Sequence, residues 1–171
     1  VGFVSTSSTV SNSYATGSVT GGSYYTGGLA GVAYTSSTIT NSYATGSVSG
    51  GNRTGGLVGY AYESTEITNS YATGAVTGAG DEVGGLVGRA SYSSTISNSY
   101  ATGKVTSTGD DTGGLVGRAQ NSTSITNSYA TGSVSSGGDA GGLVGVASRS
   151  AIENSYATGS VTGGASTGGL V

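Results

Sequence analysis

Apolar residues recur along this chain at fixed points of a short repeating unit. In the segment Tyr43–Val48, small or apolar residues alternate with polar ones. Successive side chains of a β-strand point to opposite faces, so the pattern predicts a short strand with Ala44, Gly46 and Val48 on one face. Apolar residues follow the i, i+3, i+4 spacing of a helix over no window of adequate length, so no helix is expected.

The sequence itself indicates which face of this strand meets water. The position of Ser47 is occupied by Lys104 in a later copy of the segment. Burying an unpaired lysine is very costly, so the Tyr, Thr and Ser positions of the segment are predicted to face solvent. Its Ala, Gly and Val positions are predicted to face the core.

In a second recurring segment, Leu57–Ala61, a charged residue in later copies again indicates which side faces solvent. The position of Tyr60 becomes Arg89 and Arg118 in later copies, so the Leu, Gly and Ala of this segment are expected inside. Strict alternation would then turn Val58 outward, although that position is apolar in every copy. Either the strand bends at Gly59 or something covers the row of Val58.

A third short strand is predicted around an isoleucine, with Glu66 and Glu153 among its outward neighbours. Its central residues are Val10, Ile39, Ile67, Ile96, Ile125 and Ile152.

The whole chain repeats with a period of 27 to 29 residues. The hexapeptide Asn-Ser-Tyr-Ala-Thr-Gly begins at Asn12, Asn41, Asn69, Asn98, Asn127 and Asn154. A fixed Gly-Gly-Leu block places its leucine at Leu29, Leu57, Leu86, Leu115, Leu143 and Leu170. Such periodicity marks a repeat architecture. Three short strands and three turns per unit predict an all-β fold, a parallel β-solenoid (β-helix) of roughly triangular section with six coils of about 28 residues, in which identical residues stack.

The corners of the coil are predicted from turn chemistry. Asn tolerates left-handed backbone conformations, so the Asn-Ser pair is the expected turn, with stacked Asn amides bonding to one another. The other corner is glycine-rich, running Gly50–Thr54 in one unit and Gly78–Val83 in another. It is expected to be an irregular, variable loop.

Composition narrows the possible functions. Leu, Ile, Val and Phe make up only about a sixth of the chain, but charged residues are just 8% and the net charge is −3, so a thin, regular core is expected rather than disorder. There is no Cys, and no apolar run approaches the length of a membrane span. The five basic residues are scattered and the pI is near 4.5, so neither nucleic-acid binding nor membrane insertion is expected.

The blocks Gly-Gly-Leu-Val-Gly, as at Gly55–Gly59 and Gly84–Gly88, resemble the GLUG repeat, and the resemblance covers the whole chain. The block at Gly27–Gly31 departs from it by one alanine. GLUG repeats occur in large bacterial secreted and surface proteins, including adhesin-like chains. The resemblance therefore implies an extracellular or cell-surface location. It supplies no catalytic residue, because the motif contains none.

The tyrosine and threonine columns are the first candidate binding face. Exposed rings and hydroxyls in register could bind sugar, another solenoid or ice, since the Thr and Ser positions resemble the arrays of β-solenoid antifreeze proteins. The alternative is that the rings stack only to hold the coils together. The face is represented by Tyr43, Tyr71, Tyr100, Tyr129, Thr45, Thr73, Thr102 and Thr131.

Acidic residues at the glycine-rich corner are the second candidate. Asp81, Asp110, Asp111 and Asp139 fall at equivalent positions in three successive coils and could bind Ca²⁺ through oxygen ligands. The alternative is that these aspartates serve in turns and in solubility. No catalytic constellation and no other cofactor are predicted.

These observations predict a non-enzymatic structural or adhesive repeat module, with an ice- or polysaccharide-binding solenoid as the alternative. Its expected partners are another protein, a glycan surface or ice. Six whole units without evident caps predict a single repeat domain, 1–171, within a larger protein. Open strand edges at both ends favour end-to-end association into fibrils.

Overall fold

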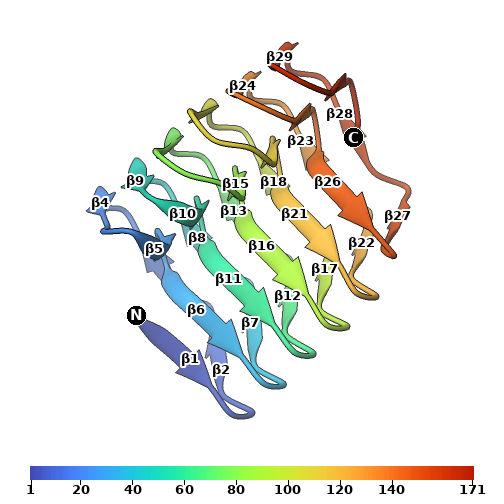
Figure 1. The fold of residues 1–171 in the computed structure, drawn as a ribbon. Coiled ribbons are helices and arrows are strands. Elements are labelled where there is room, and N and C mark those ends of the chain that lie inside the picture. The colour runs from blue at the N-terminus through green and yellow to red at the C-terminus, as the bar shows by residue number, and fades with distance from the viewer.

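The chain forms a stack of six similar coils. The computed structural model describes residues 1–171 and contains strands but no helix. The strands form five six-stranded sheets, and neighbours within a sheet come from successive coils and run parallel. The protein is therefore a parallel β-solenoid, as the sequence predicts, with its termini at opposite ends of the stack (Figure 1).

Two sheets carry the valine and isoleucine rows of the main core. Sheet A contains the Leu-Val-Gly segment and consists of β1 (Phe3–Ser5), β6 (Ala30–Tyr34), β11 (Val58–Tyr62), β16 (Val87–Ser91), β21 (Val116–Gln120) and β26 (Val144–Ser148). Sheet B contains the isoleucine row and consists of β2 (Thr9–Ser11), β7 (Thr38–Thr40), β12 (Glu66–Thr68), β17 (Thr95–Ser97), β22 (Ser124–Thr126) and β27 (Ala151–Glu153).

Three further sheets complete each coil. Sheet C consists of β3 (Tyr14–Ala15), β8 (Tyr43–Ala44), β13 (Tyr71–Ala72), β18 (Tyr100–Ala101), β23 (Tyr129–Ala130) and β28 (Tyr156–Ala157). Sheet D consists of β4 (Val19–Thr20), β9 (Val48–Gly50), β14 (Val76–Gly78), β19 (Val105–Ser107), β24 (Val134–Ser135) and β29 (Val161–Thr162). Sheet E consists of β5 (Tyr24–Gly27), β10 (Asn52–Gly55), β15 (Val83–Gly84), β20 (Thr112–Gly113), β25 (Ala140–Gly141) and β30 (Thr167–Gly168).

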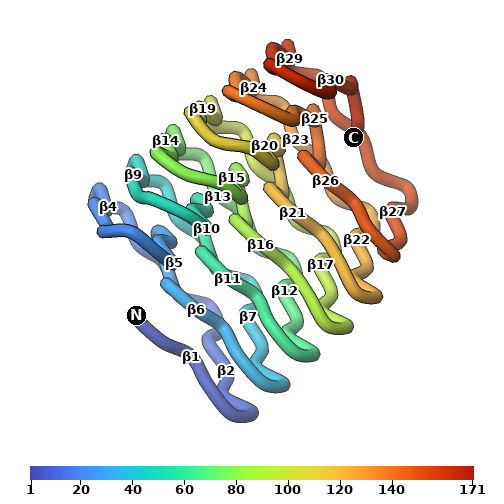
Figure 2. The backbone as a smooth tube through the Cα atoms, viewed as in Figure 1, coloured from blue at the N-terminus to red at the C-terminus, as the bar shows by residue number.

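The prediction of three strands per coil is wrong, because two of the predicted segments are organised differently. The segment Tyr43–Val48 is divided by a bend at Gly46 into β8 and the first residue of β9. The glycine-rich segment predicted as an irregular loop contains β10, which pairs in register with β5 and β15. The chain trace in Figure 2 shows the resulting bends repeated in coil after coil.

Left-handed residues turn the first four coils at three corners and the last two coils at two, and none of them is a glycine. Asn41 has φ 50°, as the Asn-Ser prediction requires, and every equivalent asparagine is also left-handed. Glu63 and Ser64 turn the chain between sheets A and B, and Arg53 turns it into sheet E. Asparagine adopts this conformation more readily than most residues, whereas Arg53 is held in it by contacts described below.

Serines, rather than asparagine amides, connect the coils at the Asn-Ser corner. The structure contains no hydrogen bond between Asn side chains of successive coils, so that expectation is wrong. Instead, the backbone N–H of every serine in this column except the last donates to the serine hydroxyl one coil further along. The column consists of Ser13, Ser42, Ser70, Ser99, Ser128 and Ser155, and its four inner members are buried.

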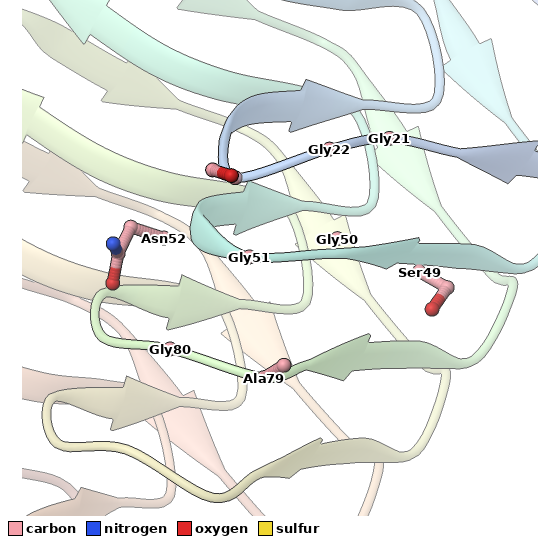
Figure 3. Close-up of a pocket in the computed structure, with 9 residues that line it drawn as sticks. Gly21, Gly22, Ser49, Gly50, Gly51, Asn52, Ala79 and Gly80 are labelled. Atoms are coloured by element: carbon pink, nitrogen blue, oxygen red, sulfur yellow. The ribbon is translucent and has the colours of Figure 1, made fainter.

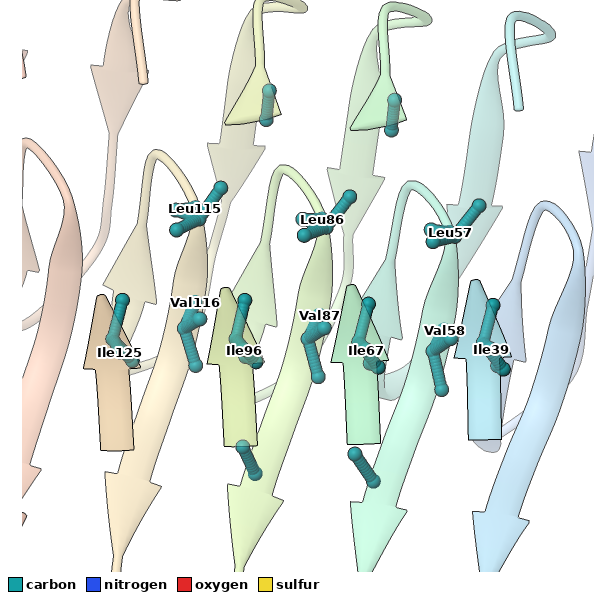
Figure 4. Packing of buried hydrophobic residues seen from close by; sticks show 14 of the residues in the cluster. Ile39, Leu57, Val58, Ile67, Leu86, Val87, Ile96, Leu115, Val116 and Ile125 are labelled. Atoms are coloured by element: carbon teal, nitrogen blue, oxygen red, sulfur yellow. The ribbon is translucent and has the colours of Figure 1, made fainter. Parts of the chain in front are cut away.

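The main core lies between sheets A, B and C, where identical residues stack in rows (Figure 4). Both Leu57 and Val58 belong to it and are fully buried. Their two N–H groups both donate to the carbonyl of Leu86, so the chain bends there and two successive side chains point inward. Of the two explanations offered for this row, the bend is correct, although it lies at Leu57 and not at Gly59.

Gly59 has a different role from the one predicted. It is buried, but a Cβ at this position would collide with the carbonyl oxygens of Gly31 and Arg53 and with the backbone nitrogen of Thr26. Sheet E therefore approaches sheet A backbone against backbone at this position. A second, smaller apolar cluster of Val76, Val83 and Val105 fills the space between sheets D and E.

Candidate binding faces

The six tyrosines of sheet C form one continuous stack. Successive ring centroids lie 5.3, 4.9, 4.8, 4.9 and 5.2 Å apart, and the planes are within 9° of parallel. The tyrosine stack consists of Tyr14, Tyr43, Tyr71, Tyr100, Tyr129 and Tyr156. Each inner ring covers the faces of its neighbours, so only ring edges and hydroxyls remain for a partner. This geometry favours the stabilising alternative over sugar binding, which needs a free ring face.

Partial burial affects the tyrosine hydroxyls. Desolvation raises the pKa of Tyr100, and its neighbours Tyr71 and Tyr129 raise it further. Ionised phenolates within one stack would repel one another. The tyrosine stack is therefore most stable with all its hydroxyls protonated.

The threonine column lies outside, as predicted. Thr45, Thr73, Thr102 and Thr131 are exposed, and so is Lys104. This confirms the predicted solvent-facing side of the Tyr-Ala-Thr-Gly-Ser-Val segment. These threonines sit at the bend between sheets C and D and belong to neither. A flat lattice of hydroxyls along one continuous strand is therefore not formed, although the spacing between coils is regular.

The four predicted calcium ligands do not converge. The N–H of Asp110 donates to the carboxylate of Asp81 (2.9 Å), and the N–H of Ser166 donates to that of Asp139 (2.9 Å). Asp111 is buried and paired with Arg118. No group of three acidic residues is arranged to hold a metal ion.

Two columns of side chains that are not adjacent in the sequence face each other where sheet E folds back onto sheet A. The first holds the left-handed corner residues Tyr25, Arg53, Glu82 and Asp111. The second lies on the outer face of sheet A and holds Tyr60, Arg89 and Arg118. We call this arrangement the corner cluster.

Ion pairs and rings hold the corner cluster together. Glu82, only 8% exposed, accepts hydrogen bonds from Arg53 Nε (2.6 Å) and Arg89 Nη1 (2.7 Å). The Arg53 guanidinium lies 5.3 Å from the ring centroid of Tyr25 and 5.0 Å from that of Tyr60. Those two rings are themselves stacked, with centroids 5.8 Å apart. The pairing of buried charges with opposite charges and with aromatic faces offsets the cost of their burial.

The environment shifts several pKa values in the corner cluster. Burial lowers the pKa of Arg53, but the hydrogen bond and negative charge of Glu82 outweigh it and raise the value. Burial raises the pKa of the Asp111 carboxyl against the opposing effect of Arg118. Desolvation likewise raises the pKa of Tyr60. Arg53 therefore stays charged at neutral pH and presents permanent donors.

A polar cavity of about 250 Å³ opens beside the corner cluster. It is lined by Tyr24, Asn52, Arg53, Asp81, Glu82, Asp111 and Arg118, which come from four successive coils.

A comparison with protein-family models matches the GLUG motif five times, at residues 22–49, 50–77, 80–106, 109–135 and 136–162. The chain belongs to the GLUG-motif family. A search of curated proteins returns no match. The GLUG repeats fold here as the coils of a β-solenoid and form a structural repeat module. The structure contains no helix that is long and apolar enough to span a bilayer.

The GLUG coils differ most on either side of sheet E, and that is where the corner cluster arises. Within a repeat unit, the pairs between the two columns join a residue to the one seven positions later, as in Arg53 and Tyr60 or Glu82 and Arg89. The recurrence of Tyr or Arg at the second position was visible in the sequence. It indicated exposure at that position, but it did not indicate the partner residue, because the two meet only where β10 folds back on β11.

The largest concave region of the GLUG solenoid, about 520 Å³, is an open groove beside sheets D and E (Figure 3). Its walls are mostly backbone of Gly21, Gly22, Gly50, Gly51 and Gly80. In later coils this space is occupied by Ser107 and Ser136, whose hydroxyls donate to the carbonyls of Gly80 and Gly109. The groove results from missing side chains and offers little chemistry of its own.

Proposed function

We propose that this GLUG chain is a stiff, non-catalytic spacer of a secreted or cell-surface protein, and that it presents an adhesive face to a partner. The observation that supports the spacer function is the continuity of all five sheets through all six coils. Bending the stack between two coils would break hydrogen bonds in five sheets at once. A solenoid of this kind acts as a rod whose length grows with the number of repeats.

The columns of identical side chains support the same function. Leucine, valine and isoleucine rows run through the core, the serine column joins the coils at the Asn-Ser corner, and the tyrosine stack joins them along the adjoining sheet C. Each contact links one coil to the next, so the rod is strengthened along its axis, in the direction that a spacer under tension needs.

Rod length provides the test of the spacer function. A second copy of residues 58–86 inserted after Leu86 adds one coil in register, since the insert begins and ends at equivalent positions. We expect the maximum dimension measured by small-angle X-ray scattering to grow by about 4.8 Å per inserted coil. A Gly/Ser insert of the same length at the same point is the control, and it should give two halves that hinge. Hinging of the coil insert as well would contradict the proposal.

The adhesive and extracellular parts of the proposal are supported by the family resemblance and by the exposure of aromatic side chains. They are tested by protease accessibility of the native protein on intact cells, and by binding of beads coated with this chain to immobilised protein and glycan surfaces. Protection from protease in intact cells would contradict the location.

Ice binding is the alternative that the exposed threonine column favours. It requires the hydroxyl spacing along the rod axis alone to match the ice lattice, because the bend at Gly46 interrupts the row of hydroxyls along the strand. The column consists of Thr45, Thr73, Thr102 and Thr131. Thermal hysteresis and faceted ice crystals would support it. Unmodified ice growth at high protein concentration would exclude it.

A further inference from the structure

Seven of the thirteen aromatic residues lie outside the tyrosine stack, and they form one connected network on sheet A, the turn after β16 and the neighbouring part of sheet E. Ring centroids link Phe3, Tyr34, Tyr62, Tyr60, Tyr25 and Tyr24 in that order at 5.1 to 6.3 Å, and Tyr92 joins at Tyr62. All seven come from residues 3 to 92, so the network occupies only part of the rod. We call it the aromatic face.

The aromatic face differs from the tyrosine stack in what it offers to a partner. Tyr24 is 60% exposed and is tilted by 42° from Tyr25, so its ring is not covered by a parallel neighbour. Tyr92 is 47% exposed and meets Tyr62 at 62°, edge to face. Exposed aromatic groups gathered on one face of a soluble protein usually mark a binding surface.

Tyr24 also lines the polar cavity, and so it joins the aromatic face to the corner cluster. Except for Glu82, whose two oxygens are both bonded to arginines, the other side chains there have some polar atoms bonded within the protein and at least one without a protein partner. Asn52 and Asp81 each accept a backbone N–H through Oδ1, which leaves Nδ2 of the first and Oδ2 of the second free. The groups are therefore held in place before any ligand arrives.

The two cavity arginines show the same arrangement. Arg53 uses Nε for Glu82 and Nη1 for the Tyr25 hydroxyl, and Arg118 uses Nε for Gln120 and Nη1 for Asp111. Nη2 of each has no protein partner. Preorganised donors and acceptors of this kind bind without the usual cost of ordering side chains.

The balance of charge identifies the class of ligand. The cavity lining carries two arginines and three carboxylates, and Arg89 behind Glu82 brings the local charge to zero. Such a site has no net attraction for an anion or a cation. A hydroxyl both donates and accepts hydrogen bonds, so it can satisfy the free arginine donors and the free carboxylate acceptors together.

We propose that the cavity beside the corner cluster, with Tyr24 as its aromatic wall, binds a neutral oligosaccharide whose hydroxyls contact Asn52, Asp81, Arg53 and Arg118. The lining residues come from four successive coils, so the site extends over about 14 Å along the rod at the spacing of parallel strands, which is longer than a single hexose ring. The proposal deepens the adhesive part of the proposed function by naming its partner, and it leaves the spacer part untouched. A rod that lengthens as expected but binds no glycan would refute this site alone.

The test is titration calorimetry of the whole chain with neutral cellohexaose, xylohexaose, mannohexaose and maltohexaose, and with acidic hexagalacturonate. At least one neutral hexasaccharide should bind. Tyr24→Ala should weaken that binding at least about tenfold, a change equivalent to the loss of one good contact. Tyr14→Ala is the matched control, since Tyr14 also lies in the first coil and is 65% exposed, and it should leave affinity within about twofold.

A second pair of variants tests the polar side of the site. Asp81→Asn keeps the Oδ1 acceptor for the Asp110 N–H but removes the charge on Oδ2, and it should also weaken binding. Asp110→Asn changes an exposed carboxylate in the next coil that does not line the cavity, and it should not. Four results would overturn the proposal: no binding of any neutral hexasaccharide at millimolar concentration, binding of hexagalacturonate alone, equal losses in Tyr24→Ala and Tyr14→Ala, or equal losses in the two aspartate variants.

Discussion

The backbone N–H of Ser42 donates a hydrogen bond to the side-chain hydroxyl of Ser70, one coil further along the chain (N···Oγ 3.2 Å). The Ser70 hydroxyl in turn donates to the carbonyl of Thr68 (2.9 Å). Each hydroxyl of the inner serine column thus satisfies a backbone donor and a backbone acceptor in a buried corner. Serine is suited to this position because its short side chain can do both.

Replacement of Ser70 by alanine should destabilise the rod. The change leaves the buried N–H of Ser42 without a partner, and an unsatisfied buried donor costs about 1–3 kcal/mol. The measurement is urea denaturation followed by circular dichroism, with the midpoint and slope compared with those of the unchanged chain. Ser47→Ala is the control, since Ser47 is exposed and bonds only the hydroxyl of Ser18. Equal losses in the two variants would show that the serine column contributes nothing specific.

The sequence predicted the stacking of identical residues because a nearly constant repeat length places equivalent residues of successive coils above one another. It missed the serine column because Ser in an Asn-Ser pair is equally consistent with an exposed turn. It missed the bends at Gly46 and Leu57 because alternation assumes an extended strand, and glycine there serves close approach between backbones rather than a turn. No glycine has a positive φ, so the usual reading of glycine as a turn residue is misleading in this fold.

Interruption of the tyrosine stack should also weaken the rod. Tyr100 stacks against Tyr71 at 4.8 Å and against Tyr129 at 4.9 Å. Each aromatic pair contributes about 0.5–1.5 kcal/mol, so Tyr100→Ala should lower the free energy of unfolding by about 1–3 kcal/mol. Tyr156→Ala removes a single pair at the end of the stack and should cost about half as much. A loss at Tyr100 no larger than that at Tyr156 would contradict an additive stack.

The same stack predicts a fall in stability at alkaline pH. Burial and the neighbouring rings raise the pKa of Tyr100 above 10.0. As pH rises, the hydroxyl therefore loses its proton in the unfolded chain before it does so in the folded chain. The contribution of protonated Tyr100 to the free energy of unfolding is complete below a pH of about 10 and is lost as the pH rises through the folded-state pKa. Urea midpoints measured across this range should fall together with the appearance of tyrosinate absorbance. Tyr100→Phe, which keeps the ring, should show a shallower fall, and an identical fall would contradict the assignment.

The candidate sites were less predictable than the fold. The exposure of the tyrosine and threonine columns followed from Lys104 alone. The corner cluster could not be derived, because its members lie seven residues apart in one coil and 28 or 29 residues apart between coils. They meet only where sheet E turns back on sheet A, and the sequence indicated a loop at that point. A Tyr or Arg that follows an acidic or basic residue by seven positions is a sequence pattern that can be searched for in other GLUG chains.

The buried valine row can be tested with an isosteric polar substitution. Val87 is fully buried, so Val87→Thr places a hydroxyl with no partner in the core and should cost about 1–3 kcal/mol. Val146→Thr is the control, since Val146 occupies the outward position of sheet A and is half-buried; its effect should stay within about 0.5 kcal/mol. Urea denaturation distinguishes them, and equal effects would place the two valines in similar surroundings.

The glycine of the repeated hexapeptide sets how closely the coils stack. A Cβ built on Gly103 would fall far inside van der Waals contact with the carbonyl oxygen of Gly74 in the preceding coil. Backbone cannot move aside as a flexible side chain can, and overpacking costs about 1–3 kcal/mol even where side chains do adjust, so Gly103→Ala should cost at least about 3 kcal/mol.

Gly17 is the matched control for Gly103, because it occupies the same hexapeptide position in the first coil and has no heavy atom within 4 Å of the added Cβ. Gly17→Ala should therefore change the free energy of unfolding by no more than about 0.5 kcal/mol. If Gly103→Ala does not fold, its circular dichroism will lack the β-sheet signal that Gly17→Ala retains, and this result also agrees with the prediction. Equal stability of the two variants would mean that the coils can separate to admit a methyl group, and the tight stacking on which the rod depends would then be wrong.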